Sequence, residues 1–206
     1  MKTITALCVQ EKNKKRVSVF LDGEFFRGIG LFVVLSERLK VGDRVDEKRL
    51  EELAETDDVS TAFERSLDHI SKAMKTKAQM IAYLKKKEYS GRVIAKVIDK
   101  LIEYGYINDE LYAARFTESR SQKEGKRKIA LELKIKGVDK ATIEGALATA
   151  PEEDESCERV ARKYLKGRTL DRELRQKAFR YLVSKGFDYD VARSALERIK
   201  DEDEDI

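Results

Sequence analysis

The first thirty residues alternate between apolar and polar side chains, whereas most of the remaining chain follows a helical spacing. Residues 3–9 (TITALCV) and 16–21 (RVSVFL) have the period-two pattern of strands, and Asp22-Gly23 is a typical hairpin turn. This pattern predicts two or three short antiparallel strands, with Cys8 as a small core residue. Two short helices are expected after them, at residues 31–39 and 46–55.

From residue 60 onward the chain repeats itself with a period of 49 residues, so that residues 60–206 contain three copies. Under this shift apolar positions fall on apolar positions, as with Leu84, Leu133 and Leu182. Each copy contains three amphipathic helical patterns. Those of the first copy lie at residues 61–73, 77–87 and 91–104. A period that holds over three copies indicates a tandem array, which exposes a long surface of the kind that binding proteins use rather than a pocket.

The pattern therefore predicts a mainly α protein. Three tandem three-helix repeats of 49 residues would form an elongated curved array, preceded by a small N-terminal region of β-hairpin and short helices. The expected domains are residues 1–59, 60–108, 109–157 and 158–206, the last ending in an acidic tail.

Helix ends recur in the repeat register. One residue in each copy has the type that caps a helix N-terminus, namely Ser90, Asp139 and Asp188. Gly137 and Gly186 stand just past the second helix of the later copies, where a left-handed backbone favours glycine. The first copy has Glu88 there, which predicts a different helix end.

Composition limits the class of protein. Charged residues make up 40% of the chain, apolar residues 41%, and there is one Pro and no Trp. This composition suits helices with charged outer faces and excludes a collagen or a disordered chain. We expect no membrane span, since no apolar run approaches 18 residues, and no signal peptide, since charged residues follow the first residues too soon. The two cysteines lie far apart in the sequence, which indicates a reducing, cytoplasmic location.

Catalytic signals are lacking in the sequence, which contains no phosphate-binding loop, no dinucleotide fingerprint and no HExxH or GxSxG motif. His69 is the single histidine, and a packing or surface role is expected for it. Cys157 lies next to the acidic run at residues 152–155, which would raise the pKa of its thiol rather than activate it. We therefore expect no catalytic residue, no metal and no cofactor, and the chain is not expected to be an enzyme.

Basic residues are more informative, because they cluster although the net charge is only +4. Residues 72–100 carry a net charge of +7 and residues 115–136 one of +5, while residues 46–64 carry −6, as a solvated helix face or a linker would. Basic stretches attract phosphate backbones or acidic protein surfaces.

Two sets of cations keep the repeat register and bracket the second helix of each copy. Lys87, Lys136 and Lys185 stand at its C-terminal end, where a cation stabilises the helix dipole. The other set is Lys77, Lys126 and Arg175, which stand near the helix N-terminus. A cation there is unfavourable for the helix dipole, so these residues are expected to contact a partner. The candidate residues for binding a partner or DNA are Lys77, Lys85, Lys86, Lys126, Arg127, Lys128 and Arg175, expected on the concave side of the array.

Aromatic residues lie between the two basic stretches and could stack on nucleobases. Tyr112 and Phe116 share one helix face and align with core positions of the other copies, so a core role is favoured for them. Tyr104 and Tyr106 flank Gly105 and are expected to order a connection.

Three segments resemble the RecX regulatory proteins. Residues 101–113 (LIEYGYINDELYA) resemble the first signature of that family, and residues 123–129 (KEGKRKI), followed by Leu133 and Gly137, resemble the second. Residues 19–25 (VFLDGEF) are similar to the amino-terminal β-region of its longer members. The motif positions carried over are Leu101, Gly105, Tyr106, Asp109, Tyr112, Ala113, Gly125, Leu133 and Gly137. Glu88, where Gly is usual, and the acidic tail depart from the family pattern.

The resemblance implies a regulator that binds RecA, the recombinase that polymerises on single-stranded DNA. Family members lodge in the filament groove and suppress ATPase, strand exchange and coprotease activities, which tempers recombination, DNA repair and the SOS response. A monomer is expected, with DNA as a possible second partner. Two alternatives stay open from the residues alone: a stand-alone DNA-binding module that uses the same cations, and a scaffold for another protein.

Overall fold

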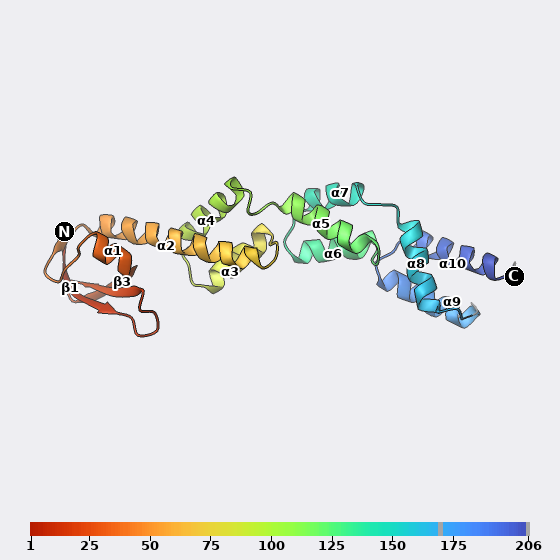
Figure 1. Ribbon diagram of the computed structural model, residues 1–206, viewed down its shortest axis with the longest axis horizontal. Helices are drawn as coiled ribbons and strands as arrows, with labels where there is room; N and C mark the ends of the chain where they lie inside the picture. Colours follow the sequence, from red (N-terminus) through yellow and green to blue (C-terminus); the bar gives the residue numbers. More distant parts are fainter. Residues whose placement is uncertain (169–170, 205–206) are drawn as a thin grey trace. The chain divides into compact units, whose positions relative to one another are not determined.

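The computed structural model describes residues 1–168 and 171–204 (Figure 1). Within these ranges, side chains are described up to Ile199. Ten helices and four strands occur within these ranges. They fall into two compact units, which are treated separately below. Unit 1 comprises residues 1–73 and 80–106, and unit 2 comprises residues 74–79 and 107–206.

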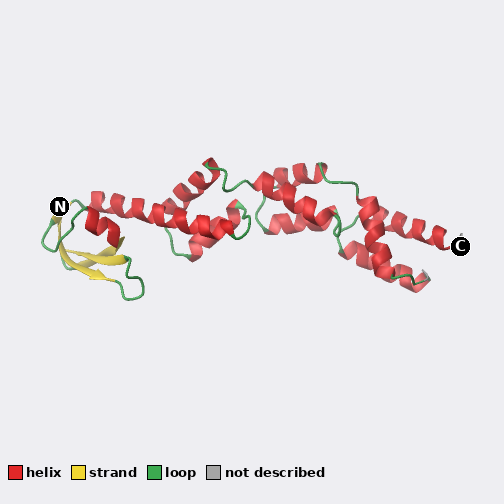
Figure 2. Cartoon of the chain, viewed as in Figure 1, coloured by secondary structure: helices red, strands yellow, loops and turns green. Residues whose placement is uncertain are grey.

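Unit 1 begins with a four-stranded antiparallel sheet in the order β3-β2-β1-β4. The strands of this sheet are yellow in Figure 2. Its strands are β1 (Lys2–Val9), β2 (Arg16–Leu21), β3 (Glu24–Gly30) and β4 (Arg44–Val45). Asp22 and Gly23 both have positive φ, of 49° and 90°, which confirms the predicted hairpin turn. The two-residue β4 adds a strand that the alternation did not reveal.

Cys8 lies on β1 as predicted, but its side chain is exposed, so the core assignment was wrong. The pairing of β1 with β2 is interrupted by a bulge between Ile4 and Ala6. A bulge reverses which face successive side chains occupy. Ile4 therefore points into the core before the bulge, Leu7 packs against the core after it, and Cys8 faces outward.

Four helices follow the sheet or intervene in it. They are α1 (Leu31–Ser36), α2 (Glu47–Ser71), α3 (Lys77–Lys86) and α4 (Gly91–Glu103). The separate helices expected at 46–55 and 61–73 form the single helix α2, and no linker divides them.

Helix α2 continues through the acidic segment because that segment has a buried face. Leu50, Ala54, Asp58 and Ala62 recur every four residues and are all buried. Asp58, only 7% exposed, accepts hydrogen bonds from Arg16 (2.7 Å) and Arg27 (2.8 Å) of the sheet. An acidic residue that is paired in this way can occupy a buried position of a helix, although acidic residues usually face solvent.

Unit 2 contains two further groups of three helices, after the first turn of α3. These helices are α5 (Asp109–Ser121), α6 (Lys126–Ile135), α7 (Lys140–Ala148), α8 (Glu153–Leu165), α9 (Arg172–Ser184) and α10 (Tyr189–Glu204). One core gathers around Ile129 and Leu133 on α6, and a second around Leu182 and Phe187 at the end of α9. The mainly α fold with a small N-terminal β-region is confirmed. The end of the acidic tail, Asp205, lies outside the described residues.

The predicted caps are confirmed at the hydrogen-bond level. Ser90 accepts from the Val93 amide and Asp139 from the Thr142 amide, while Asp188 accepts from the Asp190 amide at the start of α10. Each bond satisfies one of the amides that a helix leaves free at its N-terminus.

The end of α3 corrects the prediction for Glu88. This residue adopts the left-handed conformation, with φ of 63°, and its amide donates to Lys85 as the next amide donates to Leu84. Gly137 and Gly186 close α6 and α9 with the same two bonds. All three helices thus end alike.

Candidate partner-binding surface

Successive copies are joined through the second helix of each. Where the second copy meets the third, the first turn of α6 packs against the last turn of α9. Gly125 donates its amide to the Lys185 carbonyl (2.9 Å), and Arg127 donates to Gly186 (3.2 Å). The amide of Lys126 donates to the side chain of Glu153 at the start of α8. Free amides of a helix N-terminus are therefore satisfied by the following copy.

The first turn of α3 meets the second copy in the same way, within unit 2. Thr76 donates its hydroxyl to the Lys136 carbonyl (2.6 Å), and the Lys77 amide donates to Asp109 (2.8 Å). At both joints the contact fills the space beside a glycine. A Cβ on Gly137 would lie 2.3 Å from the Cβ of Ala78, and one on Gly186 would lie 2.5 Å from the Lys128 amide nitrogen.

The candidate cations do not form one cluster within a unit. Lys85 and Lys86 are exposed at the end of α3 in unit 1. The five others belong to unit 2, where they occupy the first turns of the second helices: Lys77, Lys126, Arg127, Lys128 and Arg175.

Several of these cations already have partners within the chain. Lys128 pairs with Glu124 (2.8 Å), which also pairs with Arg120 (3.3 Å). Burial alone would raise the pKa of Glu124, but the hydrogen bond and charge of Lys128 and the charge of Arg120 hold it below its usual value. Arg175 pairs with Glu197 (3.3 Å). These contacts anchor part of the basic set to the repeat itself.

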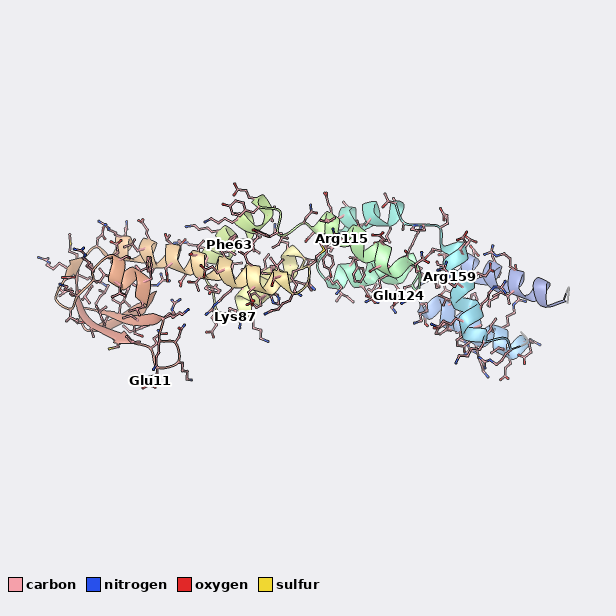
Figure 3. The ribbon with its side chains drawn as sticks, viewed as in Figure 1. Glu11, Phe63, Lys87, Arg115, Glu124 and Arg159 are labelled. Atoms are coloured by element: carbon pink, nitrogen blue, oxygen red, sulfur yellow. The ribbon has the colours of Figure 1, made fainter. Side chains whose placement is uncertain are left out.

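The motif positions are mainly structural. Leu101, Ala113 and Leu133 are fully buried, and the Leu101 carbonyl accepts the amide of Tyr106 (2.8 Å) beyond Gly105, whose φ is 71°. Asp109, Gly125 and Gly137 build the two joints described above. Tyr112 stacks on Phe116 against the core of the second copy, as expected (6.1 Å between centroids). Tyr104 and Tyr106 are exposed and meet Phe63 edge to face, at 6.0 and 6.2 Å (Figure 3).

Unit 1 contains a cavity of about 1020 Å³, which the expectation of a pocket-free surface missed. Its lining comes from the β1–β2 connection, from β2, β3, α1 and α2, and from the residues after α3, and it includes Arg16, Asp57, Arg65, Lys87 and Tyr89. Burial raises the pKa of Asp57 above its usual value, and the adjacent Asp58 raises it further. The cavity arises from tertiary packing of the sheet beside the first copy, so the residue pattern contained no signal for it.

The side chains of His69 and Cys157 pack against other groups of the protein. His69 stacks on Tyr83 with 4.0 Å between ring centroids. Burial, with Glu153 and Asp154 nearby, raises the pKa of the Cys157 thiol to about 12, in the predicted direction. Residues 1–168 and 171–204 hold no cluster of three or more side chains suited to a metal ion. In the same ranges, no helix is both long enough and apolar enough to cross a membrane.

Four family models match successive parts of the chain. Residues 2–46 match the regulatory protein RecX N-terminal domain. The first, second and third three-helix domains of RecX match residues 62–101, 108–147 and 152–196. The matches follow the order of the sheet and the three helix groups.

Whole proteins of the same family are also similar. The regulatory protein RecX of Bacillus subtilis (strain 168) is 35% identical over 211 residues, which cover 100% of this chain and 80% of that protein. RecX of Clostridium botulinum (strain Eklund 17B / Type B) is 35% identical over 202 residues, 95% of each chain. A crystal structure of regulatory protein RecX superposes with a TM-score of 0.67 at 26% identity, covering 96% of this chain and all of the other.

Proposed function

The chain belongs to the RecX family of regulatory proteins, and we propose that it binds RecA filaments on single-stranded DNA and inhibits them. The inhibited activities would be ATP hydrolysis, strand exchange and coprotease action, so that the protein modulates recombination, DNA repair and the SOS response. It would act in the cytoplasm by binding alone, as a monomer without a cofactor and not as an enzyme.

The observation that supports this proposal most is the match of all four RecX domains, in order, between residues 2 and 196. The helical copies present cations at repeating positions, which suits a partner that is itself a repeating polymer. A protein that contacts two neighbouring protomers shifts a filament between growth and disassembly by its differential affinity for the two states.

The proposed contact residues include the first turn of α6. The backbone of Lys126 and Arg127 is held in the joint with the third copy, while the Arg127 side chain is exposed. DNA enclosed by the filament is a further proposed contact of these cations.

The test is RecA ATPase activity on single-stranded DNA, with this protein well below one molecule per RecA protomer. We expect strong inhibition, and weaker inhibition by the Lys126→Glu/Arg127→Glu variant at an unchanged far-UV CD spectrum. Lys140→Glu, on the well-exposed start of α7, is the matched control and should inhibit like the unaltered protein. Absence of inhibition by the unaltered protein, even in excess, would refute the proposed function.

A further inference from the structure

The outward face of α6 carries two aliphatic side chains that the core does not use. Leu131 is 57% exposed and Ile135 75% exposed, one helical turn apart. Ile129 and Leu133, on the opposite face of the same helix, are fully buried and supply the contacts with the second copy's core. Leu131 and Ile135 are thus surplus to the packing of α6.

The other copies show that the fold does not require apolar residues here. In the repeat register, Leu131 corresponds to Ala82 and Arg180, and Ile135 to Lys86 and Ser184. Helices α3 and α9 form with these residues. The aliphatic pair therefore distinguishes the second copy from its neighbours.

The pair continues into an arginine–tyrosine contact. Arg127 lies one turn before Leu131, and its guanidinium is 5.3 Å from the ring centre of Tyr189, which is 53% exposed at the start of α10. From Arg127 to Ile135 the row extends about 12 Å along the helix. Exposed Lys134 borders the row, with Glu132 at its far edge. We call Arg127, Leu131, Ile135 and Tyr189 the α6 face.

We propose that the α6 face is a protein-docking surface, and that its partner is an apolar depression bordered by carboxylates on the RecA filament. This inference rests on the proposed function and assigns it a contact. Arg and Tyr around aliphatic anchors are the residue types that dominate binding energy at protein interfaces. The cations Arg127 and Lys134 complement acidic groups around such a depression.

Nucleic acid is a poorer fit for the same face. Leucine and isoleucine neither pair with phosphates nor stack on bases, which are the two contributions that hold single-stranded DNA. Their exposure is instead the feature expected of a patch that another protein covers.

Exchange of residues between copies tests the proposal. The Leu131→Ala/Ile135→Lys variant gives α6 the residues of the first copy, removes the aliphatic pair and adds one positive charge. We expect it to need at least about tenfold more protein for half-inhibition of RecA ATPase. Its affinity for a fluorescent single-stranded oligonucleotide, measured without RecA, should stay equal or rise. Ser184→Lys, which adds a cation at the same register of α9, is the matched control and should inhibit normally.

A second variant, Leu131→Arg/Ile135→Ser, carries the residues of the third copy. It keeps the test valid if the CD spectrum shows that the first variant is misfolded. If the unaltered protein inhibits RecA and a folded variant inhibits equally well, the docking role of the α6 face is overturned and the proposed function is not. Reduced oligonucleotide affinity would reassign the face to nucleic acid. Loss of self-association in sedimentation velocity, with inhibition intact, would reassign it to a second copy. Inactive unaltered protein would instead overturn the proposed function, and this assignment with it.

Discussion

At the scale of single residues, the last turn of the second helix shows how one backbone conformation meets different demands. Glu88, Gly137 and Gly186 share a positive φ and the same pair of closing hydrogen bonds. Gly137 and Gly186 face a preceding copy that leaves no space for a Cβ, whereas Glu88 is exposed. Glycine is thus needed for space at the two joints, whereas the uncrowded position in the first copy accepts glutamate at the cost of a left-handed backbone.

Substitutions at these aligned positions should have opposite effects on stability. Glu88→Gly relieves a left-handed non-glycine residue and should increase the free energy of unfolding by about 1 kcal/mol. Gly186→Ala places a methyl group against the backbone of Lys128 and should lower it by about 1–3 kcal/mol. Urea unfolding followed by CD measures both. Equal effects of Gly186→Ala and of Gly105→Ala, which has positive φ but open space around it, would contradict the role of the joint.

Asp57 predicts a pH dependence at the same scale. Burial and the neighbouring Asp58 raise the pKa of its carboxyl above the usual 3.8. Between 3.8 and the raised pKa the folded protein binds more protons than the unfolded chain, so this group lowers stability as pH rises. The Gly30 amide donates a hydrogen bond to the Asp57 carboxyl, and Asp57→Asn cannot titrate but keeps an oxygen that can accept this bond. We expect this variant to gain stability relative to the unaltered protein as pH rises through that window, with a constant difference above it.

Urea midpoints for both proteins at a series of pH values between about 3 and 7 would measure this difference. Asp139, whose pKa is lowered by hydrogen bonds from Thr142, serves as the opposite case. Asp139→Asn should lose stability relative to the unaltered protein as pH rises through the window below 3.8, between the lowered pKa and the usual one, and the difference should stay constant above it. A pH-independent difference for Asp57→Asn would show that its carboxyl does not titrate abnormally.

At the scale of elements, helix ends were predictable because they depend on local hydrogen bonds. Ser90 and Asp139 cap their helices through amides three residues away, so the sequence alone contains the whole interaction. The continuous α2 was not predictable, because Asp58 is an inward position only when Arg16 and Arg27 lie opposite. The bulge that turns Cys8 outward likewise depends on the pairing of β1 with β2.

The candidate cations show the same limit. Their repeat register was visible in the sequence, and it suggested contact with a partner. The structure shows that the same first turns also hold the copies together through the amides of Lys77 and Lys126, while Lys128 pairs with Glu124 of its own copy. Register alone could not separate these roles. The exposed aliphatic pair on α6 was missed because the other two copies do not have such a pair at the same positions, so the repeat contained no signal for it.

At the scale of the whole molecule, charges of each sign gather in separate segments of the chain although they nearly cancel in total. The net charge is +4, yet the last six residues contain five acidic ones. Negative side chains repel a phosphate backbone, and this repulsion acts within about a Debye length, which is about 10 Å at 0.1 M salt. The tail should therefore weaken a direct association with DNA, and should affect a contact based on apolar burial much less.

Deletion of residues 201–206 separates these two modes of binding. The truncated protein has five fewer acidic residues, so its affinity for a single-stranded oligonucleotide should rise about two- to fivefold at about 0.05 M salt. The gain should shrink as salt increases, because screening removes the contribution of the tail. Inhibition of RecA ATPase at physiological salt should change little if the α6 face and its aliphatic pair provide the main contact. A parallel rise in inhibition and DNA affinity at every salt concentration would indicate that the protein acts by binding DNA. That is the alternative interpretation of its basic segments.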